Sequence, residues 1–214
     1  LYLTWSPWHY TGQNYGVAVM FLRRGGIALP DDTKRWLYAS FILSYVLLFF
    51  VMHGREPLST SGNPYFVNGG VHLTYLGIPD AISSVAIPAA GVAYLVALAV
   101  TWTRLLKLAS FRELLPVAML CLTQALWFAI PEAARYWQFH GGLDVINFDY
   151  RTYYFSWIVF GHAIQYLWIP AYFAKAADDW KGHGRFWGKT VLIGNATWML
   201  PAIILTPDGF GTLP

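Results

Sequence analysis

Residues 36–54 read WLYASFILSYVLLFFVMHG and contain no Asp, Glu, Lys or Arg. An α-helix of about 20 apolar residues crosses the roughly 30 Å hydrocarbon core of a bilayer, so this stretch predicts a membrane span. Five more stretches of similar character surround it, at roughly 1–22, 81–103, 114–138, 152–174 and 187–206. We therefore predict an all-α protein, an integral membrane helical bundle of about six transmembrane helices.

The composition supports a membrane protein. The chain has 214 residues, of which 57% are hydrophobic and 12% are charged, whereas soluble domains usually carry about 25% charged residues. We expect one transmembrane helical domain over residues 1–214. The first residue is Leu1 rather than Met, which is compatible with a chain that lacks an N-terminal portion. Cys121 has no second cysteine to pair with, so no disulfide can form within the chain.

The basic residues alternate between loops. Three loops, 23–35, 104–112 and 175–189, hold 11 of the 14 Lys and Arg residues. Cytoplasmic loops of membrane proteins are enriched in Lys and Arg, so we expect these loops to face the cytoplasm, in a bacterial inner membrane. The net charge of +3 then reflects topology, and we expect the lipid bilayer rather than a nucleic acid as partner.

Polar side chains inside predicted spans are candidate functional residues, because burying them in a bilayer is costly. His9, Gly12, Gln13 and Gly16 share one helix face by their spacing of three, four and seven residues. The two glycines would let another helix approach closely. Pro7 is expected in a first helical turn, with Ser6 as the cap.

A second polar group lies in the fifth predicted span. His162, Gln165 and Tyr166 share one face of the expected helix. His9 and His162 each lie about 20 Å along the helix from a basic loop, counted at about 1.5 Å per residue. We therefore expect the two histidines at similar depth, facing each other or one cavity.

The fourth predicted span adds Gln124 and Glu132. Gln124, Phe128 and Glu132 follow a four-residue row on one helix face. Glu132 is expected to act as a metal ligand or a proton carrier, or else to pair with Arg135. The remaining histidines are expected to be solvated, and they are His53, His72, His140 and His183.

These residues suggest a metal site for a lipid-soluble substrate. His9 and His162, joined by Glu132, could hold non-haem iron with positions left open for oxygen. The cofactor-binding candidates, which would orient these ligands, are Gln13, Gln124, Gln165 and Tyr166. A carotenoid, fatty acyl chain or quinone would fit a site within the bilayer. No His-x-x-His or His-x-x-x-His occurs, which argues against a desaturase with several histidine boxes.

The segment Ser6-Pro7-Trp8-His9-Tyr10, followed by Gly12, resembles the His-aromatic-Gly motif of bacterial Brp-like carotene dioxygenases. This resemblance implies oxygen-dependent cleavage of a polyene at an iron held by four histidines. This chain has Gln13 in place of the expected acidic residue and Tyr166 in place of a second histidine. The Trp-His-x-x-x-Gln and His-x-x-Gln-Tyr-Leu-Trp segments resemble uncharacterised bacterial multi-pass proteins more closely.

Two other functional classes remain open beside a metal-dependent oxygenase or oxidoreductase. The chain could be a scaffolding or pigment-binding subunit among other membrane subunits, with His9 or His162 as axial ligand of a haem iron or chlorophyll magnesium. A transporter ranks third, because transporters are often built from inverted repeats and the last three spans do not visibly repeat the first three.

Overall fold

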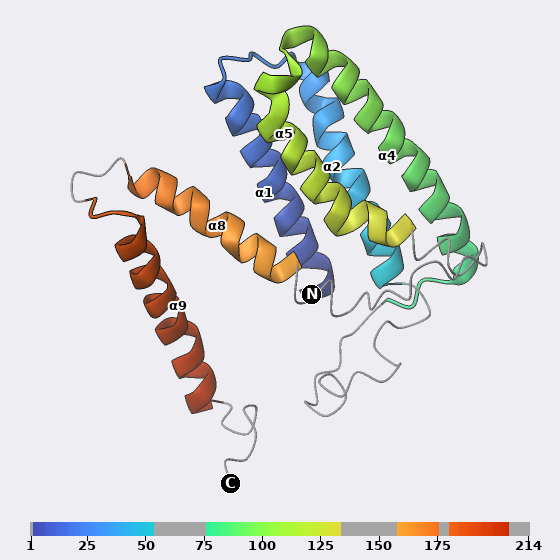
Figure 1. The fold of residues 1–214 in the computed structure, drawn as a ribbon. Helices are drawn as coiled ribbons and strands as arrows, with labels where there is room; N and C mark the ends of the chain where they lie inside the picture. The colour runs from blue at the N-terminus through green and yellow to red at the C-terminus, as the bar shows by residue number, and fades with distance from the viewer. Residues whose placement is uncertain (1, 54–75, 134–157, 176–179, 206–214) are drawn as a thin grey trace. The chain divides into compact units, whose positions relative to one another are not determined.

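The computed structural model describes residues 2–53, 76–133, 158–175 and 180–205 (Figure 1). Most of these residues are helical, with no β-strand among them, and this confirms the all-α prediction. The helices are α1 (Tyr2–Arg24), α2 (Asp31–Met52), α4 (Asp80–Leu108), α5 (Phe111–Gln124), the π-helix η1 (Ala125–Ala129), α8 (Val159–Ala174) and α9 (His183–Leu205).

The chain divides into two compact units. The first unit comprises Leu1–Asn63 and His72–Arg151, and the second comprises Pro64–Val71 and Thr152–Pro214. Helices α1, α2, α4, α5 and η1 therefore belong to the first unit, and α8 and α9 belong to the second. A single domain over the whole chain therefore stays a prediction.

Three helices among the described residues are long and apolar enough to cross a membrane. They are Asp31–Met52, Asp80–Leu108 and Phe111–Ala133, the last being the continuous helix that contains α5 and η1. They correspond to the stretches predicted at 36–54, 81–103 and 114–138. The other three predicted spans fall on α1, α8 and α9, and the total of six spans stays a prediction.

The helix ends of the first unit follow from local sequence. Helix α2 begins after Pro30 with Asp31 and Asp32 in its first turn, where acidic side chains interact favourably with the helix dipole. Helix α5 begins with a capping box, in which the Ser110 backbone N–H donates to Glu113 Oε2 at 2.8 Å. Such caps satisfy donors that the first turn would otherwise leave without partners.

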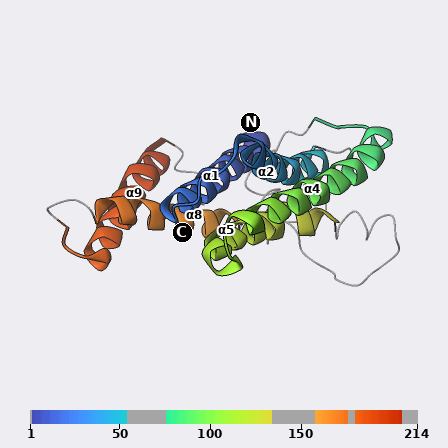
Figure 2. The ribbon, with the colours of Figure 1, turned by 90° about the horizontal axis from the view of Figure 1, so that it is seen from above.

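Consecutive helices of the first unit run antiparallel to one another (Figure 1). Helix α2 contacts both α1 and α4, and α5 lies against α1 (Figure 2). The connections 25–30 and 109–110 meet at one end, where Arg104 of α4 forms an ion pair with Asp32 of α2. The loops 23–35 and 104–112 therefore share one end of this unit, as the basic-residue pattern predicts.

Small residues bring α4 close to α2. Ala90, Tyr94 and Ala97 of α4 are buried, and a core cluster joins Ala90 and Tyr94 to Leu47 of α2. The opposite face of α4 is apolar and exposed along its length, as expected of a surface that faces lipid. The exposed residues of this face include Ile82, Val85, Val92, Leu95, Val96 and Leu106.

One expectation for the first predicted span was wrong. Helix α1 starts at Tyr2, so Pro7 lies inside the helix and Ser6 does not cap it. The approach of another helix to Gly12 and Gly16 stays a prediction, and no described helix of the first unit provides it. Both glycines are exposed, and a Cβ atom added to either would meet no other atom within 4 Å. The physical reason is that Asn14, on another face of α1, is hydrogen-bonded in the interior and sets the rotation of the helix.

Candidate functional site

A cluster of buried polar side chains joins three helices of the first unit. Its centre is Gln124, at the end of α5. The Gln124 Nε2 group donates to Thr11 Oγ1 of α1 and to Ser44 Oγ of α2, both at 2.9 Å. Its Oε1 atom accepts from Asn14 Nδ2 at 2.8 Å. All four side chains are at most 2% exposed, so we call Thr11, Asn14, Ser44 and Gln124 the polar hub.

Hydrogen bonding within the polar hub is almost complete. Gln124 uses both N–H groups, and Ser44 Oγ donates to the Phe41 carbonyl at 2.7 Å. Asn14 Oδ1 has no hydrogen-bond partner among the described residues. A buried polar atom without a partner costs about 1–3 kcal/mol, so one water molecule there would be favourable. The expected role of Gln124 in cofactor binding stays a prediction, and the contacts shown support a structural role.

The sequence pointed to Gln124 but missed its partners. The sequence pattern favours Gln13 on α1, whereas the buried amide is the adjacent Asn14, about 100° further around the helix. Thr11 and Asn14 are three residues apart, as residues on one helix face are, and Ser40 and Ser44 have the equivalent four-residue spacing. These two spacings are the signal that could have located the polar hub.

A pair of polar residues lies where α1 begins and α2 ends. His53 is only 3% exposed, and its Nε2 atom lies 2.9 Å from Thr4 Oγ1 of α1. The Tyr45 hydroxyl donates to the Thr4 carbonyl at 3.3 Å, which also ties α2 to α1. The expectation that His53 is solvated was therefore wrong, because the last turn of α2 packs against the start of α1.

Glu132 is fully buried, with 0% of its surface exposed. It follows η1 and lies eight residues after Gln124, about 12 Å further along the helix. The predicted partner Arg135 lies outside the described residues. The expected role of Glu132 as a metal ligand or proton carrier stays a prediction. π-Helices like η1 are often found next to functional sites.

His9 lies on the open face of α1 that also carries Gly12 and Gly16. Its ring is exposed and stacks on Trp5, with ring centroids 5.0 Å apart and an interplanar angle of 8°. Gln13 is half-buried, and its Nε2 atom has no hydrogen-bond partner among the described residues. This face of α1 therefore presents the His9 imidazole, the Trp5 ring and the exposed backbone at Gly12 and Gly16.

His162 and Gln165 are half-buried on α8 of the second unit, and Tyr166 is 54% exposed. His9 belongs to the first unit and His162 to the second. The expectation that both histidines lie at a similar depth in the membrane therefore stays a prediction, and so does a metal ion bound by both.

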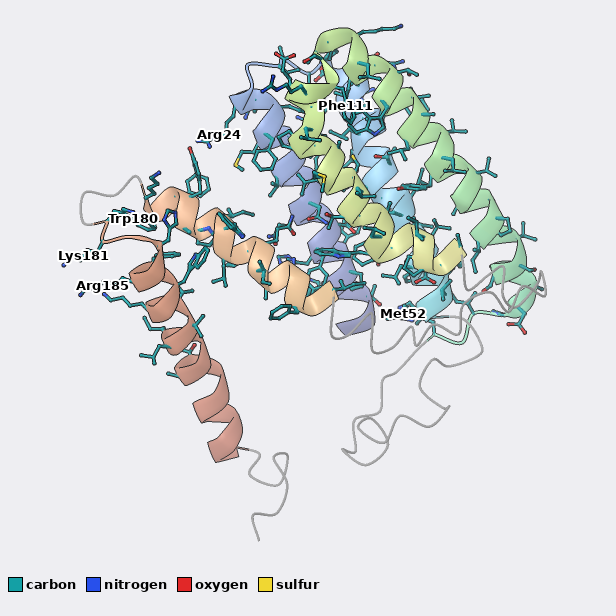
Figure 3. All side chains as sticks on the ribbon, in the orientation of Figure 1. Arg24, Met52, Phe111, Trp180, Lys181 and Arg185 are labelled. Carbon is teal, nitrogen blue, oxygen red and sulfur yellow. The ribbon has the colours of Figure 1, made fainter. Side chains whose placement is uncertain are left out.

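An aromatic cluster links α8 and α9 within the second unit. Trp168 of α8 meets Trp187 of α9 edge to face, with ring centroids 5.4 Å apart. His183 packs against Trp180 at 5.0 Å and remains exposed, as expected for a histidine of this loop. Lys181 and Arg185 lie beside this cluster (Figure 3). Such rings favour the boundary between lipid and water.

Potential metal ligands are spread out in the described parts of the chain. Among these residues, no three His, Cys, Asp or Glu side chains come close enough together to hold a metal ion. His72 and His140 lie outside the described residues. Comparisons of the chain with protein-family models, curated proteins and solved structures found no match. The resemblance to carotene dioxygenases and its four-histidine iron site therefore stay predictions.

We predict that His53 stabilises the first unit by joining α2 to α1. His53 is 3% exposed, and its Nε2 atom lies 2.9 Å from Thr4 Oγ1. Removing one partner of a buried hydrogen bond leaves the other unsatisfied, which costs about 1–3 kcal/mol. Thermal unfolding in detergent should therefore show a lower Tm for His53→Ala than for the wild type.

His183→Ala is the matched control, since His183 is exposed, and it should keep the wild-type Tm. An unchanged Tm in His53→Ala would contradict this role of His53.

Proposed function

We propose that the chain is an integral protein of a bacterial inner membrane that crosses it six times. The support comes from the three helices of sufficient length and apolarity and from the exposed apolar face of α4. In this topology the loops 23–35, 104–112 and 175–189 face the cytoplasm, since they hold 11 of the 14 basic residues.

Cysteine labelling tests this topology in a Cys121→Ala background. Ser110→Cys and Gly184→Cys should react with an impermeant thiol reagent only from the cytoplasmic side. Leu76→Cys should react only from the other side, because the Ile78 backbone N–H, two residues further on, donates to the His53 carbonyl at the opposite end of α2. Labelling of Ser110→Cys and Gly184→Cys from opposite sides would contradict the topology.

Within the membrane, the function that the geometry supports best is that of a cofactor-binding subunit. The observation that carries this proposal is the open face of α1 around His9. An exposed imidazole can serve as an axial ligand to the metal of a haem or chlorophyll. Gly12 and Gly16 follow on the same face, and neither has side-chain atoms that would hold a flat macrocycle away from the helix. A single axial histidine is enough for such a site.

A non-haem iron oxygenase or oxidoreductase for a lipid-soluble substrate is the second candidate. The specific observation in its favour is the fully buried Glu132 carboxyl. Such a site would need Glu132 and His162 as ligands in addition to His9, because non-haem iron oxygenases typically hold iron by two histidines and one carboxylate.

Absorption spectra and metal content of the purified chain distinguish the two candidates. If the first is correct, His9→Ala loses a macrocycle band that wild type and His183→Ala retain. Gly12→Leu should lose the same band while keeping the wild-type Tm, because its side chain fills open space and leucine favours a helix over glycine by roughly 0.5–1 kcal/mol.

The contrary outcomes are equally specific. Equal macrocycle content in wild type and His9→Ala would reject the axial-ligand proposal. Iron without a macrocycle band, lost in His9→Ala, His162→Ala and Glu132→Gln, would establish the non-haem site instead. Equal iron content in all these variants would reject the non-haem site too.

A further inference from the structure

One end of the first unit is strongly basic. It contains the end of α1, the start of α2, and the hairpin between α4 and α5. Arg24 and Phe111 mark this end in Figure 3, and Met52 marks the other. Three acidic residues lie here among seven basic ones, which are Arg23, Arg24, Lys34, Arg35, Arg104, Lys107 and Arg112.

Two of these three acidic residues already form an ion pair or hydrogen bonds within the unit. Asp32 pairs with Arg104, and Glu113 accepts hydrogen bonds from the Ser110 hydroxyl and backbone N–H. The side chains of Lys34, Lys107 and Arg112 are exposed, and the structure shows no ion pair for them among the described residues. Cationic groups are therefore in excess at this end.

Apolar and aromatic side chains lie directly beside these cations. Trp36 is 36% exposed, next to Arg35, and Phe111 is 59% exposed, next to Arg112. Leu106 and Leu108 flank Lys107 and are 51% and 41% exposed. Aromatic and basic side chains on a helix end match the headgroup layer of a membrane, where a ring contacts lipid while a cation meets phosphate.

The described residues of the opposite end carry no comparable charge. Residues 2–10, 45–53, 76–90 and 125–133 contain no Lys or Arg at all, while Asp80 and Glu132 lie among them. Within the described part of this unit, a partner attracted by positive charge would therefore meet the cations at the basic end. A nucleic acid would not use the exposed apolar side chains between the cations, whereas a phospholipid would.

We propose that the basic end of the first unit binds the headgroups of anionic phospholipids, with Lys34, Lys107 and Arg112 contacting lipid phosphate. Lipid binding at this end rests on the proposed insertion of the chain in a membrane. Each Lys or Arg near an anionic membrane surface strengthens binding by about 1 kcal/mol, or roughly fivefold. Neutralising three of them should weaken binding on the order of 100-fold.

The test uses the full chain in detergent micelles, titrated with phosphatidylglycerol or phosphatidylcholine and followed by mass spectrometry of bound lipid. Wild type should retain phosphatidylglycerol in preference to phosphatidylcholine, and added salt should weaken this preference. The triple variant Lys34→Gln, Lys107→Gln, Arg112→Gln should lose it. The matched variant Lys34→Arg, Lys107→Arg, Arg112→Lys keeps every charge and should retain it.

Three results would contradict the proposed lipid site. The neutralised variant could keep the wild-type preference for phosphatidylglycerol, or the charge-keeping variant could lose it. The third is a wild-type preference that added salt does not change. Displacement of the lipid by millimolar glycerol phosphate would show a site for soluble phosphate instead. Failure of the membrane proposal itself looks different, since the chain would then be released from membranes by alkaline extraction.

Discussion

Replacing Gln124 by leucine is expected to lower the free energy of unfolding of the first unit by about 3 kcal/mol. The substitution removes three side-chain hydrogen bonds, to Thr11, Asn14 and Ser44. Hydrogen bonds between helices within membranes contribute about 0.6 kcal/mol on average and up to about 1.7 kcal/mol. The partners stay buried with unmet hydrogen-bonding groups, which places each bond of this cluster above that average, at about 1 kcal/mol.

The measurement is reversible unfolding of the purified chain in mixed micelles, compared with a control variant. Leu122→Ala is the control, because Leu122 lies two residues away and is 47% exposed, and it should change stability by less than about 1 kcal/mol. A Gln124→Leu variant as stable as this control would show that the polar hub does not hold the helices together.

A double variant tests the same hydrogen bonds more sharply. Asn14→Leu and Gln124→Leu each leave the other amide without its partner, but together they remove both. Replacing both partners of a buried hydrogen bond by apolar groups can be nearly neutral. We therefore expect the double variant to be destabilised by less than the sum of the single variants. Strict additivity would argue against a direct interaction of the two amides.

Replacing Phe41 by alanine is expected to destabilise the first unit by about 3–5 kcal/mol, as truncation of a buried aromatic ring usually does. Phe41 is 1% exposed, and its ring meets Tyr15 of α1 edge to face at 6.2 Å.

The matched control for this truncation is Phe111→Ala. Phe111 is 59% exposed, so its truncation leaves no interior cavity and should cost less than about 1 kcal/mol. Both variants are compared with the wild type by the same unfolding measurement. Equal destabilisation by the two substitutions would contradict the packing of α2 against α1.

The local features of the chain were predictable from its residues. The apolar runs at 36–54, 81–103 and 114–138 coincide with helices that can cross a membrane, because run length and hydropathy are properties of consecutive residues. The shared end of the loops 23–35 and 104–112 also followed, since helices joined by short loops run antiparallel. The Arg104–Asp32 ion pair confirms that these two loops meet.

The site was predictable only in part. Gln124 was recognised because an amide inside an apolar run is conspicuous, but the helices that supply its partners cannot be read from one segment. His53 was expected in water because Arg55 follows it closely in the sequence. In the structure His53 is bonded to Thr4, 49 residues away, and only the packing of α1 against α2 creates that contact.

The sequence by itself determined the helical class, the three helices of membrane length and the placement of basic residues at one end of the first unit. Those properties depend on the hydropathy of consecutive residues and on the placement of Lys and Arg in alternate loops. Only the tertiary structure decided which face of each helix points inward. Helix α1 buries Thr11 and Asn14 and leaves His9, Gly12 and Gly16 outside. The physical reason is that the hydrogen-bonding groups of Gln124 find partners on that face of α1, and a helix rotates as a whole to satisfy them.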